Sequence, residues 1–397
     1  MKGIFLGAGA SYECGMPLVW EFTNVLRANI LKRLDTHLFD FRENPSFKAY
    51  FQQLLSNTDL HYEEMIGKLE AIQLERGNLS EVARTTALQL VDCVQILLLE
   101  DQEITTRLFA EKVKDYSGIS SLLTKHPCLS VFSLNHDINF EEICKFHNID
   151  FRDGFFDEQI KRYSNIAIFK SLRKEQIDAK TLNFFESTEK GINLIKLHGS
   201  LDIFAVEDKN VYLKCAPPLN APLGGHVQEI RKIEQHSIKL SQAVGTRTIG
   251  ELDVTDNEGE IQFLRRSLLS GANKFKGTFD QVAPIAFFEE FKRRLTKITE
   301  LDVIGYGFGD NHVNEVLESW IKKKNTKINI YDPRRETLPE CLTFAAEKIK
   351  IINFGLTGYF RQFEPSEEDQ LTQLRNEAFI TVRENLRKKR LGSWPPA

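Results

Sequence analysis

The chain has 397 residues, of which 42% are hydrophobic and 27% charged, a composition typical of globular protein with two domains or one domain with a large insertion. Its formal net charge of −4 excludes a global electrostatic footprint for binding nucleic acid or an anionic membrane. The longest apolar runs are far shorter than the ~20 residues that span a bilayer, and no signal-peptide pattern opens the sequence, so a cytoplasmic protein is expected.

The first elements in chain order are a strand, a glycine turn and a helix. Residues 2–6 form a short apolar run that stops at Gly7, and an apolar helical pattern follows Pro17. From about 45 to 125 the pattern is almost wholly helical, and Asn78-Leu-Ser-Glu81 has the form of a capping box before a helix that runs to about Glu100. We interpret residues 37–125 as a helical insertion.

Alternating α/β character returns after the insertion. Short apolar runs predict strands at 129–134, 194–197, 301–304, 328–331 and 349–353. Runs of this kind suit a parallel sheet that is covered on both faces. We therefore expect an α/β fold, a Rossmann-like parallel sheet with helices on both faces, formed by residues 1–36 and 126–360.

Two later regions carry other patterns. Residues 205–280 are less regular, and the acidic stretch at 251–260 resembles a surface loop. A C-terminal helix and tail are expected over 361–397, with an apolar stripe that includes Leu374, Ala378 and Val382. The basic run Arg387–Arg390 is interpreted as a solvated helix end rather than a contact with DNA or an acidic partner.

The glycine turn after the first strand reads Gly7-Ala8-Gly9-Ala10-Ser11, and Gly15-Met16-Pro17 follows it. Glycines allow close backbone approach to a pyrophosphate, and a helix N-terminus favours negative charge. The dehydrogenase pattern would need a glycine at position 12, where Tyr12 stands, and no P-loop pattern is present. The segment predicts a phosphate cradle, with a purely structural strand-to-helix turn as the alternative.

Two polar segments follow predicted strands, where ligands of open parallel sheets bind. The first contains Asn135, which can hold a ribose hydroxyl or a water, and Asp137, which can orient its neighbours. The second contains His198, which can accept a proton near neutral pH. Taken singly, each segment also fits a polar turn, a helix cap or a structural histidine.

Two further strand ends carry a glycine turn at 305–309 and an aspartate, Asp332, that could receive a ribose hydroxyl. The ordered set of these segments resembles the sirtuin-like family, especially its branch in bacterial antiphage defence. The segments are GAGAS with GMP, LNHD, KLHGS, GYGFGDNH and IYDP. The resemblance covers the strands from residue 2 to about 355. It implies catalytic roles for Asn135 and His198. It also implies an NAD site lined by Gly7, Ala8, Gly9, Ser11, Pro17, Asp137, Gly305, Tyr306, Phe308, Asp310 and Asp332.

The sequence departs from the deacylating branch of that family. Between His198 and Gly305 the only cysteine is Cys215, so the four-cysteine zinc module of deacylases is missing, and neither zinc nor another metal is expected. The residues after Pro17 are Leu-Val-Trp-Glu-Phe instead of the Asp-Phe-Arg of deacylases. Both differences disfavour acyl-lysine chemistry.

The resemblance implies an NAD hydrolase that releases nicotinamide and ADP-ribose and acts in abortive infection by depleting NAD. It further implies a homo-oligomer and a separately encoded partner, such as a HerA-like hexameric ATPase or an Argonaute protein. Control of the activity is expected in the helical insertion and the C-terminal helix. A non-catalytic sensor of NAD or ADP-ribose and an NAD-dependent ADP-ribosyl transferase or deacylase stay open as alternatives.

Overall fold

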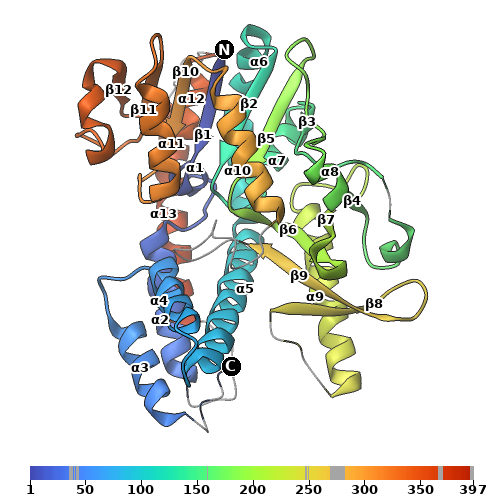
Figure 1. Cartoon of the computed structure of the whole chain (residues 1–397). Coiled ribbons are helices and arrows are strands. Elements are labelled where there is room, and N and C mark those ends of the chain that lie inside the picture. Colours follow the sequence, from blue (N-terminus) through green and yellow to red (C-terminus); the bar gives the residue numbers. More distant parts are fainter. Residues whose placement is uncertain are drawn as a thin grey trace.

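The computed structural model describes residues 1–34, 44–158, 160–245, 250–268, 282–364 and 370–393, together with Phe39, Phe41 and Thr248. Its centre is a seven-stranded parallel sheet with the strand order β12-β11-β10-β1-β2-β5-β3 (Figure 1). The strands are β1 (Lys2–Leu6), β2 (Cys128–Ser133), β3 (Phe151–Arg152), β5 (Gly191–Lys196), β10 (Glu300–Ile304), β11 (Lys327–Tyr331) and β12 (Ile349–Ile352). The predicted α/β fold is confirmed.

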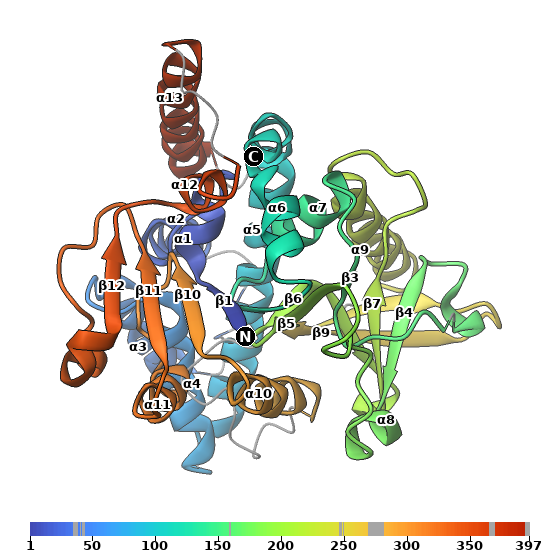
Figure 2. The same cartoon turned by 90° about the horizontal axis from the view of Figure 1, so that it is seen from above.

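Both faces of this sheet are buried because successive side chains of each strand point to opposite sides. In β1, Ile4 and Leu6 pack in one core and Phe5 in another. Figure 2 shows helices on both faces of the sheet. One face carries α10 (Val282–Leu295) and α11 (Asn311–Ile321); the other carries α6 (Gly118–Lys125), α7 (Asn139–Phe146) and α12 (Leu356–Arg361).

A second, antiparallel sheet has the strand order β4-β7-β6-β9-β8, and the sequence did not predict it. Val254 and Leu264 are buried in its core together with Ile230 of the covering helix. The interpretation of residues 251–260 as a surface loop is therefore wrong for 251–255, which form a strand, whereas 256–260 form a turn with exposed residues. The elements are β4 (Phe169–Arg173), β6 (Gly199–Val206), β7 (Val211–Cys215), α9 (Gly225–Val244), β8 (Glu251–Thr255) and β9 (Ile261–Leu268).

The N-terminal helices form a core of their own, in which Phe22, Phe51, Met65 and Leu90 are buried. They are α2 (Val19–Arg33), α3 (Pro45–Ser56), α4 (Tyr62–Leu74) and α5 (Ser80–Lys112), and the five-residue α1 (Ala8–Tyr12) precedes them. The boundary expected near residue 37 lies outside the described residues. Shorter elements are η1 (Val113–Tyr116), η2 (Lys161–Tyr163), α8 (Lys174–Asp178), η3 (Glu207–Lys209) and η5 (Glu340–Lys348).

Helix α5 connects the helical core to the parallel sheet. The predicted capping box is wrong, because Leu79 is the N-cap residue and provides no side-chain cap, and the helix continues past Glu100 to Lys112. In the described part of the chain, this helix with η1 (Ser80–Tyr116) is the one segment long and apolar enough to cross a membrane, but half of its most apolar window is buried.

The C-terminal helix α13 (Gln370–Ser393) packs by a face that the sequence pattern did not indicate (Figure 1). Leu374 and Val382 of the predicted apolar stripe are exposed, whereas Arg383, Arg387 and Arg390 are buried. Spacings of four and three residues place these arginines on one face of the helix. The interpretation of the 387–390 run as a solvated helix end is wrong for Arg387 and Arg390; the tail at 394–397 lies outside the described residues.

The buried arginines of α13 form what we call the arginine interface. Each contacts a carboxylate of α2 or α5: Arg383 Nη2 lies 2.6 Å from Glu21 Oε2, Arg387 Nη1 lies 2.8 Å from Asp101 Oδ1, and Arg390 Nη2 lies 2.6 Å from Glu100 Oε2. Arg383 also donates to the carbonyl of Tyr12, and Arg387 to the carbonyl of Gly15. Helix α13 is thereby fixed to the segment that follows the glycine turn.

Candidate active site

The predicted motif segments meet at the carboxyl edge of the parallel sheet. The N–H of Gly9 donates to the carbonyl of Gly305 over 2.8 Å, and the N–H of Gly305 donates to the carbonyl of Tyr331 over 2.9 Å. These bonds connect the turns that follow β1, β10 and β11. The arrangement follows from the parallel pairing, which brings the ends of neighbouring strands to one edge of the sheet.

The glycines of the two turns are required by contact between the turns themselves. A Cβ on Gly9 would lie 2.7 Å from the Cα of Gly305, and a Cβ on Gly7 would lie 2.5 Å from the Cα of Tyr306. Gly305 also has a φ of +62°, in the left-handed region that favours glycine. The glycine pattern therefore has a packing cause that is independent of any bound phosphate.

Asn135 connects the end of β2 to the glycine turn. Its Nδ2 donates to the carbonyl of Gly7 and to Ser11 Oγ, both over 2.9 Å. Its backbone N–H donates to Ser133 Oγ over 3.1 Å. Because the two amide donors are used, the hydrogen-bonding capacity that the side chain retains is that of Oδ1, an acceptor. Asn135 is half-buried, so this acceptor suits a water or a ribose hydroxyl.

Asp137 lies deeper than its neighbour Asn135. Its Oδ1 accepts from the N–H of Asn139 over 3.0 Å, and its carbonyl accepts from Lys196 Nζ. Burial raises the pKa of the Asp137 carboxyl, although Lys196 and a hydrogen bond from Ser11 oppose the rise. These contacts give Asp137 a role in fixing the loop after β2, rather than an open position on a ligand.

His198 is buried beside Asp310. Its Nε2 lies 2.9 Å from Asp310 Oδ2, and the ring of His136 lies 6.2 Å away between centroids. The carbonyl of His136 accepts from the N–H of Leu201 and from Ser200 Oγ. The Asn135 loop and the His198 loop are thus joined directly, as the strand-end prediction requires. We call Asn135, His198, Asp310 and the two glycine turns the strand-end cluster.

Asp310 lies at the start of α11, beside His198. It caps α11, because its Oδ1 accepts from the N–H of Val313 over 3.2 Å. The hydroxyl of Tyr306 accepts from the N–H of Asp310 and lies 3.0 Å from Asn314 Oδ1. Burial raises the pKa of Tyr306 well above its usual range, so this hydroxyl keeps its proton at neutral pH.

The remaining predicted residues lie around this cluster. Asp332 follows β11, and its Oδ1 accepts from the N–H of Arg334 over 2.9 Å; its Oδ2 lies 3.8 Å from Arg335 Nε. The Arg335 guanidinium also lies 5.3 Å from the ring centroid of Phe308. Phe308 has a φ of +60° and packs on Tyr306. Pro17 is buried and Ala8 is half-exposed.

A group of buried charges beside the cluster was not predicted. Lys214 Nζ on β7 lies 2.9 Å from Asp153 Oδ2 and 3.3 Å from Glu141 Oε1. His226 Nε2 lies 3.2 Å from Asp202 Oδ2. Burial alone would lower the pKa of His226, but the hydrogen bond and charge of Asp202 outweigh it and raise that pKa. These residues come from distant segments and join the two sheets, so no local sequence pattern indicated them.

A small cavity lies where several of the polar side chains converge. A cavity of about 10 Å³ is bounded there by Ser11, Asn135, Asp137 and Lys196, among apolar neighbours. This volume suits one water molecule, whereas pockets for ligands of cofactor size measure roughly 300–1,000 Å³.

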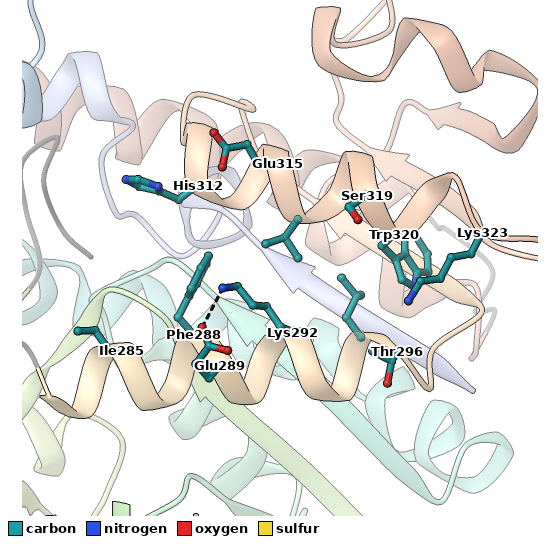
Figure 3. Close-up of a pocket in the computed structure, with 12 residues that line it drawn as sticks. Ile285, Phe288, Glu289, Lys292, Thr296, His312, Glu315, Ser319, Trp320 and Lys323 are labelled. Atoms are coloured by element: carbon teal, nitrogen blue, oxygen red, sulfur yellow. Dashed lines mark hydrogen bonds and ion pairs between the residues drawn. The ribbon is translucent and has the colours of Figure 1, made fainter. Parts of the chain in front are cut away.

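A groove of about 560 Å³ lies between α10 and α11. Figure 3 shows the side chains of Phe288 and Trp320 along it, with Lys292, His312 and Lys323 also directed toward it. None of the predicted site residues lines this groove, so the geometry gives it no part in NAD chemistry.

Within the described ranges, no three His, Cys, Asp or Glu side chains are arranged to hold a metal ion. All six cysteines are free, and four of them are buried. A scan against protein-family models found no matching family, and a search of curated proteins found no match. The functional assignment of this chain therefore depends on the geometry of its own residues.

Proposed function

We propose that the chain hydrolyses NAD at the bond between nicotinamide and ribose, releasing nicotinamide and ADP-ribose. The observation that carries the proposal is the junction of the Asn135 and His198 loops beside the glycine turn. It provides a hydrogen-bond acceptor and a base at the carboxyl edge of a parallel sheet, where such folds bind nucleotides. The resemblance of the motifs to the sirtuin-like family supports the same chemistry.

The reaction needs little from the protein besides placement and charge stabilisation. Water attacks the anomeric carbon of the ribose, the bond to nicotinamide breaks, and its electron pair neutralises the nicotinamide ring. The proton of the attacking water passes to His198, and from there to solvent. Asn135 Oδ1 accepts a hydrogen bond from this water or from a ribose hydroxyl. In this division of roles His198 is the base and Asn135 the orienting acceptor.

The docking of α13 supports a regulated enzyme. The arginine interface fixes the segment that follows the glycine turn. We place control of the activity in α13 and the helical insertion, through self-assembly or through a separately encoded partner such as a HerA-like ATPase. Hydrolysis released from this control would deplete cellular NAD, which fits abortive infection.

A second candidate function is a sensor that binds NAD or ADP-ribose without cleaving it. The Asn135 acceptor at the carboxyl edge of the sheet serves binding as well as cleavage, so it supports this function too. A sensor predicts ligand-induced thermal stabilisation without nicotinamide release.

The test is to incubate the purified full-length chain with NAD, alone and with the product of a neighbouring gene, and to quantify nicotinamide and ADP-ribose. We expect His198→Ala and Asn135→Ala to lower the rate by about 100-fold or more. The matched control is His126→Ala, because His126 precedes β2 at the opposite edge of the sheet. Equal release by wild type and His198→Ala would contradict the assignment; NAD-dependent stabilisation without release would support the sensor.

A further inference from the structure

We propose that Asp310 is a positioning residue for His198, holding the imidazole in the tautomer with the proton on Nε2 and stabilising its protonated form. The catalytic consequence rests on the proposed NAD hydrolysis, whereas the pairing itself does not. The motif resemblance assigned Asp310 to the dinucleotide site, so this role is different from the one expected.

The contact between the two side chains is short and shielded from solvent. Asp310 Oδ2 lies 2.9 Å from His198 Nε2, and the two side chains are only 10% and 6% exposed. A carboxylate and an imidazole this close interact more strongly when solvent screening is weak. Asp310 is therefore placed to set the orientation and the proton affinity of the ring.

The Asp310 carboxylate is itself held rigidly. Its Oδ1 accepts from the N–H of Val313 at the start of α11, which leaves Oδ2 directed to His198. The hydroxyl of Tyr306 bonds the backbone of Asp310 on the other side and lies 3.0 Å from Asn314 Oδ1. Two separate sets of contacts thus fix the direction from which the carboxylate reaches the ring.

This orientation assigns the two ring nitrogens. Because Nε2 faces the Asp310 carboxylate, we assign the proton to Nε2, which leaves Nδ1 as the atom that takes the proton of the attacking water. His136, from the loop between β2 and α7, places a second ring 6.2 Å away. The nearby Lys196 ammonium is directed to the carbonyl of Asp137 and the carboxylate of Glu141. Among these neighbours, Asp310 is the anion in direct contact with the ring.

A purely structural role for Asp310 makes a different prediction. Asn and Ser are good N-cap residues, so Asp310→Asn and Asp310→Ser keep the cap of α11 and remove the charge from His198. If Asp310 only capped the helix, both variants would behave as wild type. We expect melting temperatures close to wild type and a kcat lower by about 10²- to 10⁴-fold, with KM for NAD changed much less.

The pH profile separates positioning from capping. Loss of the carboxylate makes protonation of His198 less favourable, so the acidic limb of kcat should move to lower pH in Asp310→Asn. Unchanged kcat and an unchanged acidic limb in both variants would overturn the proposal. A loss of melting temperature with an unmoved limb would also overturn it, in favour of a structural cap.

A measurement that does not depend on turnover completes the test. In protein labelled with ¹⁵N-histidine, the two imidazole tautomers give distinct nitrogen shifts, and His198→Gln identifies the His198 signals. We expect the Nε2–H form in wild type and a mixture of tautomers in Asp310→Asn. Identical His198 spectra and titration in the two proteins would overturn the pairing. A changed spectrum without any NAD hydrolysis would retain the pairing and reject the proposed function.

Discussion

The strand-end cluster and the arginine interface both bury charged side chains, but they do so in different ways. In the cluster, Asn135, His198 and Asp310 come from separate strand ends and converge. In the arginine interface, one helix contributes every cation, and each cation pairs with a carboxylate. The first arrangement retains hydrogen-bonding capacity for a ligand, whereas the second uses its charges to fix α13.

The comparison shows that buried charge alone does not identify a functional site. Burial raises the pKa of Asp101 even though Arg387 and Arg390 lie beside it and lower that pKa. The cost of desolvation at this contact is therefore large relative to the attraction between the partners. Such a contact specifies where the helix docks more than it adds net stability. We infer function only where polar groups converge and retain unused hydrogen-bonding capacity.

The largest effect on stability is expected at the arginine interface. Arg387→Ala leaves Asp101 as a buried carboxylate without its closest cation, which should lower the free energy of unfolding by about 3–5 kcal/mol. Urea unfolding followed by circular dichroism measures this change. An unchanged free energy of unfolding would show that α13 is not fixed by this pair.

The matched control replaces both partners with apolar residues of similar size. Arg387→Met combined with Asp101→Leu should recover most of the lost stability, because no unpaired charge stays buried. If the double variant were as unstable as Arg387→Ala, packing of the arginine stem rather than the charge would be the cause.

Substitution of Asn135 in the strand-end cluster should affect stability less than Arg387→Ala does, and should affect NAD hydrolysis more. Asn135→Ala removes two hydrogen bonds, to Gly7 and to Ser11, which should cost about 1–3 kcal/mol. The folded variant should nevertheless lose nicotinamide release, as measured by chromatography at a temperature well below its melting point. Full turnover in folded Asn135→Ala would contradict a functional role for the strand-end cluster.

The smallest effect is expected at an exposed ion pair. Lys114 Nζ lies 2.9 Å from Glu111 Oε2, and both side chains are more than half exposed. Solvent screens such a pair, so Lys114→Ala should change the free energy of unfolding by less than about 1 kcal/mol. If Lys114→Ala lowered the free energy of unfolding as much as Arg387→Ala, burial would not determine how much an ion pair matters for stability.

Much of the parallel sheet could be predicted from the sequence, because its strands other than β3 are short runs rich in apolar residues. Phe132 and Val303 lie in such runs and are buried. Because the strands are parallel, the polar residues that follow them meet at one edge of the sheet. The antiparallel sheet could not be predicted, since the acidic residues of β8 mask its alternation around Val254. Arg387 was misread because its partner Asp101 is distant in sequence.

The role of Asp310 also could not be derived from sequence. Its position after a glycine turn indicates a helix cap or a ligand contact, and both readings are local. The contact with His198 depends on how β5 and β10 are placed in the sheet, with β1 and β2 between them. A pairing between segments more than a hundred residues apart carries no local pattern.

The contact between Gly9 and Gly305 has a consequence for how this sequence can change over evolutionary time. A methyl group at either position would meet backbone atoms of the other turn, and backbone cannot rotate away as a flexible side chain can. Neither glycine can mutate alone without moving both strand ends. Across divergent descendants of this chain the two positions should therefore be inherited as a pair.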